Sequence, residues 1–376
     1  MKALGPIDNL LVQTLRGPTV WPDGMNPDSV HDRAVYQGVA ALLSGDHLAG
    51  WPAPVLIRLR DTALAQAMWE IRHRLVLTRL LGQLDEVGIR SVLLKGSALA
   101  YRYYINPSAR ARSDTDLLVA AGDLARARGV LTDQGYAPCH DPDTGSGDHG
   151  QESWSLQVPD GGTHEIDLHW SVLNSPVLDT ALPAGMALAA AVPLGVLGRG
   201  AWVLPLHLAL LHACLHRSKH VTSPYFVDQM IHFGGDRLIW LIDIDLMLRA
   251  MTPDDMMTFE SAAALGGVGR ICGQALAAAN GLLGTPVPAG LTERLHYMPQ
   301  GPAGSYLGQS HQAGRVLQDL AAVQGLAGKA RYLARRLFPP AAMLRARYPD
   351  RSGWPLPGLY LLRLVDFWRP RGAKTR

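Results

Sequence analysis

The spacing of apolar residues predicts a long helix in the first quarter of the chain. Apolar side chains recur at helical spacing across residues 55–81, and no glycine or proline interrupts this stretch before Gly82. The positions that follow this spacing are Leu59, Ala63, Met68, Ile71, Leu75 and Leu80. We therefore expect residues 1–85 to form a mainly helical N-terminal segment.

Short apolar runs replace this pattern between residues 86 and 175. Residues 91–94 predict a strand, and the Lys95-Gly96-Ser97 sequence predicts a turn into a helix over 98–104. Further elements are predicted as strands at 114–119, 152–158 and 163–170, a helix at 123–134 and a loop at 140–150. The last two strands flank Pro159-Asp160-Gly161-Gly162, which is typical of a hairpin turn.

Helical spacing returns after residue 174, most clearly over 204–220, 237–250 and 268–283. The pattern as a whole predicts an α+β or α/β protein, in which a small mixed sheet with helices is inserted between mainly helical segments. We expect four parts, at residues 1–85, 86–175, 176–310 and 311–376.

Composition excludes several classes of protein. The 376 residues are 48% hydrophobic and 18% charged, which suits two or three compact units with a buried core. Cys139, Cys214 and Cys272 are too widely spaced to suggest a disulfide framework or a C-x-x-C metal site, so we expect a reducing compartment. The N-terminus lacks an apolar run of signal-peptide length, and prolines and histidines interrupt the most apolar stretch, at 185–215. We expect a cytoplasmic protein without a membrane span.

Charge is distributed unevenly. Residues 329–376 hold twelve of the 35 Lys and Arg residues but two of the 32 acidic residues, so the C-terminal segment is strongly basic. Its apolar residues at 356–368 could pack on the body and leave the arginines solvated. Alternatively, the segment could cover a cleft and attract an acidic acceptor or a triphosphate. A nucleic-acid partner is the less favoured alternative, because no nucleic-acid motif accompanies the charge.

Acidic side chains gather on two of the predicted strands. Asp114 and Asp116 are two residues apart, so both carboxylates point to one face of their strand. On the later strand, Glu165, Asp167 and His169 share one face by the same alternation. Neighbouring carboxylates repel each other unless a cation lies between them, so the pattern favours a site for one or two divalent ions.

The Lys95-Gly96-Ser97 turn is a candidate phosphate site. Gly96 would allow a close approach of the backbone or a positive φ, and the helix that follows would offer free N–H groups. Ser97 adds a hydroxyl donor. Strand–glycine–helix joints are common in proteins, so a purely structural role is the alternative.

Taken together, these motifs resemble the nucleotidyltransferase superfamily of the DNA-polymerase-β type. Within it, the chain is most similar to a group of bacterial uncharacterised nucleotidyltransferases, over about residues 55–290. The similarity is carried by these sequences: Leu93-Leu94-Lys95-Gly96-Ser97-Ala98-Leu99, Arg110-Ala111-Arg112-Ser113-Asp114-Thr115-Asp116-Leu117-Leu118-Val119, Glu165-Ile166-Asp167-Leu168-His169-Trp170 and Arg237-Leu238-Ile239-Trp240-Leu241-Ile242-Asp243. The spacer between Ser97 and Asp114 is longer than in the general superfamily pattern.

The resemblance implies a polymerase-β-type core that transfers a nucleoside monophosphate from an NTP, with ATP expected, in the presence of Mg²⁺ or Mn²⁺. Asp114 and Asp116 would hold the metal bound to the nucleotide, and Asp167 would hold a second metal and activate the acceptor. The residues expected at the nucleotide are Lys95, Gly96, Ser97, Arg110, Arg112, Lys219 and His220. For the two arginines, an exposed loop position is an equal alternative.

The resemblance favours a small-molecule or peptide hydroxyl as the acceptor, with tailoring of a peptide natural product such as a lasso peptide as one role. A toxin-like enzyme that modifies a protein or tRNA is a second hypothesis. A catalytically silent nucleotide-binding protein is a third.

Two other motifs resemble metal sites. Asp243 and Asp245 also form an Asp-x-Asp pair, but they lie on a predicted helix, where residues two apart diverge. We expect Asp243 to bind a neighbouring helix or a basic residue instead. His212, His216 and His220 share one helical face. Zinc binding there is conceivable, but we favour histidines that pack beside the cleft.

Overall fold

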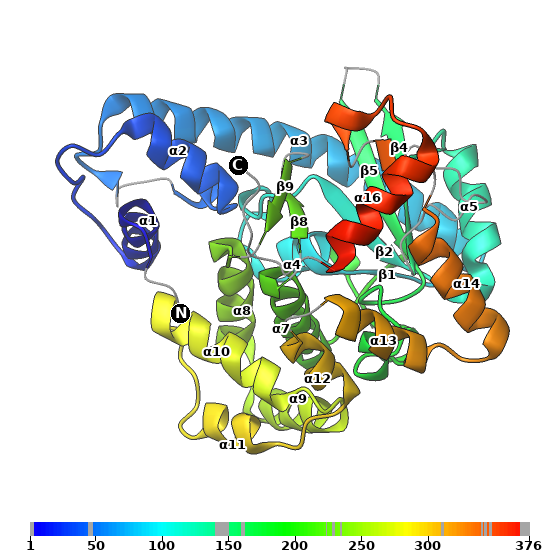
Figure 1. Cartoon of the computed structure of the whole chain (residues 1–376). Helices are drawn as coiled ribbons and strands as arrows, with labels where there is room; N and C mark the ends of the chain where they lie inside the picture. Colours follow the sequence, from blue (N-terminus) through cyan, green and yellow to red (C-terminus); the bar gives the residue numbers. More distant parts are fainter. Residues whose placement is uncertain are drawn as a thin grey trace.

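A seven-stranded mixed sheet organises the described part of the chain (Figure 1). The computed structural model describes residues 4–43, 48–139, 150–158, 162–222, 224–227, 230–233, 235–309, 312–339, 341, 344–345 and 348–368. The strands are β1 (Ser91–Leu93), β2 (Asp114–Leu118), β3 (Ala137–Pro138), β4 (Gln151–Gln157), β5 (Thr163–His169), β6 (Val192–Pro193) and β7 (Ala201–Val203), in the order β3-β4-β5-β2-β1-β7-β6. Pairs β2–β5 and β1–β7 are parallel, and the other neighbours are antiparallel.

The four strands predicted from the sequence are confirmed as β1, β2, β4 and β5, and the α+β organisation with a mixed sheet is confirmed with them. Most of the predicted loop and hairpin turn, at 140–149 and 159–161, lies outside the described residues. The sheet continues past residue 175 because β7 pairs with β1. Gly200, directly before β7, lets the chain pass close to α3, because a Cβ at that position would lie 2.3 Å from the carbonyl oxygen of Leu81.

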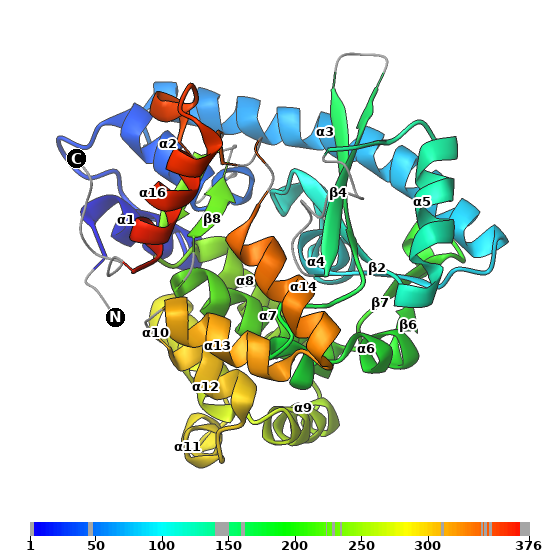
Figure 2. The ribbon, with the colours of Figure 1, turned by 45° about the vertical axis from the view of Figure 1, so that its right-hand side comes forward.

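Alternate residues of the central strands enter two different cores. Leu93, Leu117 and Ile166 pack on the sheet face covered by α3 (Ala53–Glu86) and α5 (Leu124–Asp133). Val92 and Leu118 point to the other face, toward α7 (Leu206–Thr222), α8 (Leu238–Ala250) and α10 (Gly269–Leu283). Figure 2 shows α7, α8 and α10 grouped below α3 and to the left of β4, with α5 on the right. The acidic residues of β2 and β5 therefore face the C-terminal helices.

Helix α3 is longer than predicted, and its apolar residues are not all buried. It continues through Gly82 to Glu86. Met68, Ile71 and Leu75 are 59%, 74% and 75% exposed, although they follow the helical spacing. Glu70 and His73 are buried instead, because Arg112 and Thr115 supply polar partners at this end of the core.

The N-terminal helices pack on α8. Helices α1 (Pro6–Arg16) and α2 (Pro27–Tyr36) share an apolar core with Leu238 and Ile239 at the start of α8. Gln37 joins the two parts, because its side chain accepts from Leu238 N at 2.8 Å and its carbonyl accepts from Ile239 N at 3.2 Å. Helices that precede the sheet in the sequence thus pack directly on α8, which follows it.

The remaining elements complete the helical side. They are α6 (Ala184–Ala190), the hairpin β8 (Pro224–Val227) and β9 (Met230–Phe233), α9 (Pro253–Leu265), α11 (Leu291–Tyr297), α12 (Pro302–Gly308), α13 (Gln312–Ala322), α14 (Leu326–Leu337) and α16 (Leu356–Trp368). Asp319 of α13 ties α12 and α14 to the segment that follows β5, since it accepts hydrogen bonds from Ser175, Tyr306 and Tyr332. None of the helices in the described part of the chain combines the length and apolar composition needed to cross a membrane.

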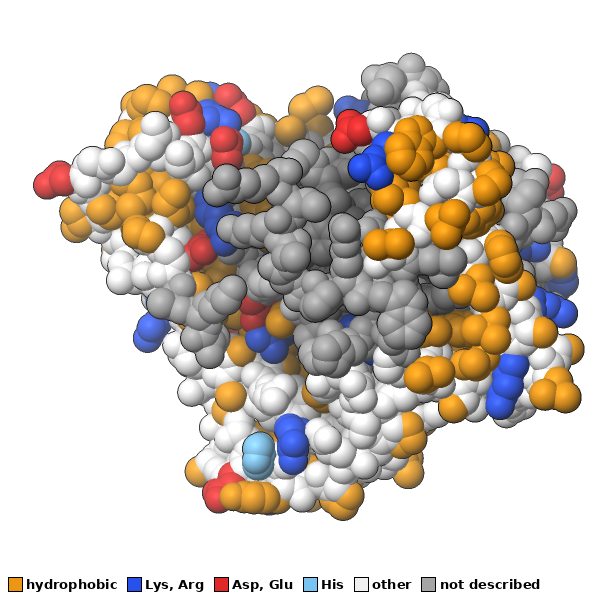
Figure 3. Space-filling model, viewed as in Figure 1, with side chains coloured by type: hydrophobic (Ala, Val, Ile, Leu, Met, Phe, Trp, Pro, Cys, Tyr) orange, Lys and Arg blue, Asp and Glu red, His pale blue; other side chains and the backbone are white. Residues whose placement is uncertain are grey.

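The basic C-terminal segment is helical where it is described. Helix α14 carries the first basic residues of this segment. In α16, Leu359 is buried while Leu361 and Val365 are exposed, and Figure 3 shows apolar side chains gathered over α14 and α16. The last basic residues, 369–376, lie outside the described part, so cleft contact by this segment stays a prediction.

A buried ion pair connects the loop before β2 to α8. Arg110 donates to Asp243 through Nε at 2.9 Å and through Nη2 at 2.7 Å, and the Tyr104 hydroxyl donates to the same carboxylate at 2.7 Å. Arg110 and Asp243 are 8% and 4% exposed. This confirms the expectation that Asp243 binds a basic residue, while Asp245 pairs with Arg249.

Replacing Asp243 should therefore destabilise the protein strongly. Asp243→Ala leaves the buried guanidinium of Arg110 without its counter-charge, which should lower the free energy of unfolding by about 3–5 kcal/mol. Urea unfolding followed by circular dichroism measures the effect. Asp245→Ala is the matched control, because Asp245 pairs with the half-exposed Arg249 one turn along the same helix. The control should lose no more than about 0.5 kcal/mol. Equal losses in both variants would contradict a structural role for the Arg110–Asp243 pair.

Candidate active site

The pairing of β2 with β5 brings the acidic residues together. Asp116 lies directly opposite Asp167 in the parallel register, and Asp114 lies opposite Glu165. Asp116, Asp167 and His169 each offer a ligand atom, and these atoms all lie within 4.8 Å of one another. Asp114 does not belong to this trio, although the sequence predicted it as a metal ligand. The predicted common face of the strand residues is confirmed. His169 is an additional ligand candidate on this face.

Positive and polar groups surround Asp116. The Lys95 ammonium contacts Asp116 Oδ1, and His169 Nε2 lies 2.9 Å from the same oxygen. Burial opposes ionisation of Asp116, but the charge of Lys95 and the hydrogen bond with His169 outweigh it, so the pKa of Asp116 is well below its usual range. Asp116 is therefore ionised at neutral pH.

The other two carboxyl groups hold their protons more tightly. Burial and the negative charges of Asp116 and Asp167 raise the pKa of Asp114 to about 7. Burial and the charge of Asp116 also raise the pKa of Asp167, against a hydrogen bond donated by Ser153 at 2.5 Å. Gln151 adds a second donor to Asp167, at 3.2 Å. The protein supplies too few positive charges for three carboxylates.

This deficit of positive charge suits a divalent cation. Two carboxylates and one imidazole nitrogen, whose ligand atoms lie within 4.8 Å of one another, form a donor set that a metal ion accepts. A bound cation would offset the repulsion that raises the pKa values of Asp114 and Asp167. The residues present therefore fit the metal that the sequence motifs imply.

The turn before α4 (Lys95–Tyr103) differs from expectation in one respect. The residue with a positive φ is Lys95, at 46°, and not Gly96. A Cβ at Gly96 would meet the Arg112 side chain at 3.4 Å and Arg110 Nη1 at 3.6 Å, which are ordinary contacts. The left-handed backbone at Lys95 starts the helix beside Asp116, while Gly96 lies against the two arginines.

Ser97, Arg110 and Arg112 are held by protein partners. Ser97 is 1% exposed, its hydroxyl accepts from Arg112 Nε at 3.2 Å, and it lies 3.1 Å from the Thr115 hydroxyl. Arg112 donates to Glu70 at 2.5 Å, as Arg110 does to Asp243. The alternative of exposed loop positions for the two arginines is therefore wrong, because both guanidinium groups are buried in ion pairs. Their contact with a nucleotide stays a prediction.

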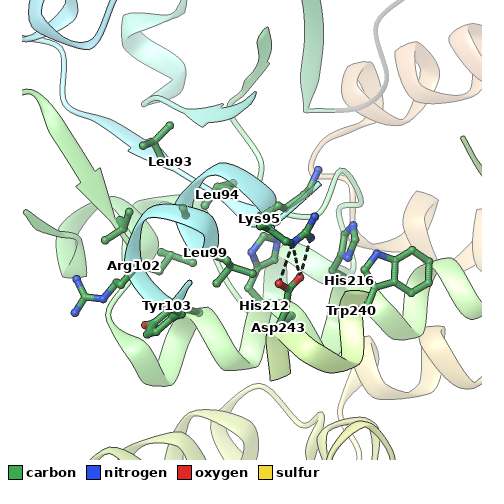
Figure 4. Close-up of a pocket in the computed structure, with 16 residues that line it drawn as sticks. Leu93, Leu94, Lys95, Leu99, Arg102, Tyr103, His212, His216, Trp240 and Asp243 are labelled. Atoms are coloured by element: carbon green, nitrogen blue, oxygen red, sulfur yellow. Dashed lines mark hydrogen bonds and ion pairs between the residues drawn. The ribbon is translucent and has the colours of Figure 1, made fainter. Parts of the chain in front are cut away.

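A row of histidines on α7 borders the site. Figure 4 shows Lys95, His212 and His216 around one pocket, with Trp240 of α8 beside them. The His216 ring centroid lies 4.4 Å from that of His220 and 5.7 Å from that of Trp240. Burial and the positive charge of Lys95 lower the pKa of His212 to about 3, so its ring is neutral.

These contacts support histidines that pack beside the cleft. Among the described residues, the group found with three close ligand atoms is the one on β2 and β5, and it contains none of the three α7 histidines. Lys219 donates to the Leu173 carbonyl at 2.8 Å. Nucleotide contact by Lys219 and His220 stays a prediction.

Sequence reasoning missed His169 as a ligand candidate, as well as Ser153 and Gln151 on β4. A signal for His169 was present, since alternation placed it on the same strand face as Asp167. The two β4 residues became visible only through the antiparallel register, which sets Ser153 opposite Asp167.

The raised pKa of Asp114 predicts a pH-dependent stability in the metal-free protein. The folded state holds the Asp114 proton up to about pH 7, while the unfolded chain releases it near pH 4. Stability therefore falls as pH rises through this interval and is constant with respect to this group above it. Asp114→Asn removes the titration, so its gain in melting temperature over the wild type should grow between pH 4 and pH 7. Differential scanning calorimetry with a chelator present measures this. A gain that does not change with pH would contradict the raised pKa.

Comparisons with known proteins place the chain in a family. No curated protein sequence matches it. One similar solved structure is an antigenic nucleotidyltransferase-like protein from Paracoccidioides brasiliensis, with 14% identity, 61% of this chain and 94% of that chain covered, and a TM-score of 0.36. That superposition is too loose to support an inference about the site. A family model described as uncharacterised nucleotidyltransferase matches residues 25–284, which is more than half of the chain and includes β1, β2, β5, α7 and α8. The chain belongs to this family of uncharacterised nucleotidyltransferases.

Proposed function

We propose that this protein is a divalent-metal-dependent nucleotidyltransferase that moves a nucleoside monophosphate from an NTP, with ATP expected, to an acceptor hydroxyl. The observation that carries the proposal is the convergence of Asp116, Asp167 and His169 within 4.8 Å, in a chain of a nucleotidyltransferase family. An ordinary surface cluster of acids would not be buried under helices. One carboxylate of the cluster, that of Asp116, also contacts the Lys95 ammonium.

The reaction replaces one bond to phosphorus with another. The acceptor oxygen bonds to the α-phosphorus of the NTP, the bond to the bridging oxygen breaks, and pyrophosphate leaves with the electron pair. The proton of the acceptor passes to a carboxylate of the site, for which we propose Asp167. A divalent cation supplies charge neutralisation for the triphosphate and the leaving pyrophosphate.

The residues of the chain have distinct tasks in this proposal. Asp116, Asp167 and His169 would hold the cation, and Asp114 adds negative charge beside them. The Lys95 ammonium contacts Asp116 at the edge of the site, so it is suited to meet a phosphate oxygen. The first backbone N–H groups of α4 add donors on the same side.

The acceptor is proposed to be a hydroxyl of a small molecule or a peptide, with tailoring of a peptide natural product such as a lasso peptide as one role. This part rests on the family resemblance. Screening acceptors with radiolabelled ATP would test it, and incorporation of label into tRNA or protein alone would favour the toxin-like alternative.

Asp116→Asn should abolish nucleotidyl transfer and leave the fold intact. Asparagine preserves the size of the side chain but removes the charge that a divalent ion requires, so turnover should fall by at least about a thousandfold. Pyrophosphate release measures turnover, and circular dichroism checks the fold. Glu165→Gln is the matched control, since Glu165 is exposed on the same face of β5 and lies outside the ligand trio. Full activity of Asp116→Asn would refute the metal assignment.

Asp167→Asn should separate chemistry from binding. If Asp167 accepts the proton of the acceptor and helps to hold the cation, the variant should lose single-turnover rate far more than affinity for the NTP. Rapid-quench kinetics and calorimetric titration with a non-hydrolysable ATP analogue give the two quantities. A variant that loses nucleotide binding but turns over the bound nucleotide normally would show that the role of Asp167 is different.

A further inference from the structure

We propose that His169 makes the metal site favour first-row transition ions, of which Mn²⁺ is the one tested below, over Mg²⁺. The sequence pattern emphasised carboxylates, which suit Mg²⁺. The structure instead brings one imidazole nitrogen to within 4.8 Å of an oxygen from Asp116 and an oxygen from Asp167. The inference rests on the metal role in the proposed function, but not on the identity of the nucleotide or the acceptor.

The hydrogen bonds of His169 define which ring nitrogen faces the carboxylates. Nδ1 lies 3.2 Å from the backbone carbonyl oxygen of Ser171. A carbonyl oxygen can only accept, so Nδ1 must carry the hydrogen of this bond. When a metal ion displaces the proton on Nε2, the lone pair of this nitrogen is directed at the carboxylates. Histidines that bind metals usually have this arrangement, in which the outer nitrogen donates to a carbonyl or a carboxylate.

His169 Nε2 lies where a cation could bind it together with the two carboxylates. It lies 2.9 Å from Asp116 Oδ1, with which it forms the hydrogen bond described above, and a metal ion that binds both atoms would take the place of the shared proton. The ring is fully buried at the end of β5, so it cannot turn toward solvent to escape the carboxylate. The nitrogen is therefore available to an ion that also binds Asp116 and Asp167.

The type of donor decides which ion benefits. Mg²⁺ prefers oxygen ligands and keeps much of its water, so an imidazole nitrogen contributes little to its binding. First-row transition ions bind nitrogen donors more strongly, and Mn²⁺ also accepts the two carboxylates of this site. A nitrogen donor from His169 at the third ligand position should thus favour Mn²⁺ over Mg²⁺.

The test measures metal binding to the full chain without nucleotide. Mn²⁺ is titrated by electron paramagnetic resonance and displaced with Mg²⁺, which gives the ratio of the two affinities for the wild type and for His169→Gln. Glutamine offers an amide oxygen in place of the nitrogen, so the variant has an all-oxygen donor set. We expect the Mn²⁺/Mg²⁺ affinity ratio to fall by at least about tenfold, mainly through weaker Mn²⁺ binding.

His164→Gln is the matched control. His164 is also a buried histidine of β5, but it points to the opposite face of the sheet, where its Nδ1 bonds to the Tyr136 hydroxyl at 2.8 Å. Its affinity ratio should equal that of the wild type. An unchanged ratio in His169→Gln, or the same decrease in both variants, would overturn the inference.

A second measurement needs no variant and covers the case in which His169→Gln does not fold. Mn²⁺ bound to wild-type protein should show spin-echo modulation from one directly coordinated nitrogen, and this signal should change when histidine is labelled with ¹⁵N. A Mn²⁺ spectrum without nitrogen coupling would overturn the inference.

The outcome is separable from the proposed function. His169-dependent Mn²⁺ selectivity without pyrophosphate release from any NTP would support the metal site and contradict the transferase. Pyrophosphate release that Mg²⁺ supports as well as Mn²⁺, with an unchanged affinity ratio in His169→Gln, would contradict the selectivity and support the transferase.

Discussion

The burial of carboxylates on two neighbouring parallel strands is the constraint on which the site depends. Because Asp116 lies opposite Asp167 on one sheet face, their charges cannot be separated, and the helical cover limits their solvation. Two groups of the protein contact the Asp116 carboxylate: the ammonium of Lys95 and the imidazole of His169. These contacts stabilise Asp116 but leave the pKa values of Asp114 and Asp167 raised. The remaining excess of negative charge is what suits the site to a divalent cation.

A second set of buried charges holds this arrangement from both sides. Arg112 pairs with Glu70 of α3, and Arg110 pairs with Asp243 of α8. The two arginines belong to the segment that leads into β2, so the start of the strand that carries Asp114 and Asp116 is tied to helices from both flanking segments. The site is therefore not a property of the sheet alone. Removal of α3 or α8 would leave a buried guanidinium without its partner, and such a group is costly to bury.

The sequence predicted those features that depend on local alternation. The common face of Asp114 and Asp116, and that of Asp167 and His169, follow from a period of two within single strands. The partners of Arg110 and Arg112 could not be predicted from alternation. Asp243 is 133 positions away from Arg110, and Glu70 is 42 positions away from Arg112. Strands of two or three residues, such as β6 and β7, are too short for any periodicity. The burial of Glu70 and His73 could not be predicted, because only the tertiary structure provides their polar partners.

The histidines of α7, which lie beside the site, need to be uncharged for the site to bind a cation. His212 and His216 line the pocket next to Lys95, and burial together with nearby positive charge lowers the pKa values of both rings. If these rings were protonated, they would neutralise the carboxylates from the opposite side and weaken the binding of any metal ion. Neutral imidazoles leave the negative charge of β2 and β5 to Lys95 and to a bound cation. The same burial that excludes solvent from α7 thus preserves the charge deficit that suits the site to a metal ion and a triphosphate.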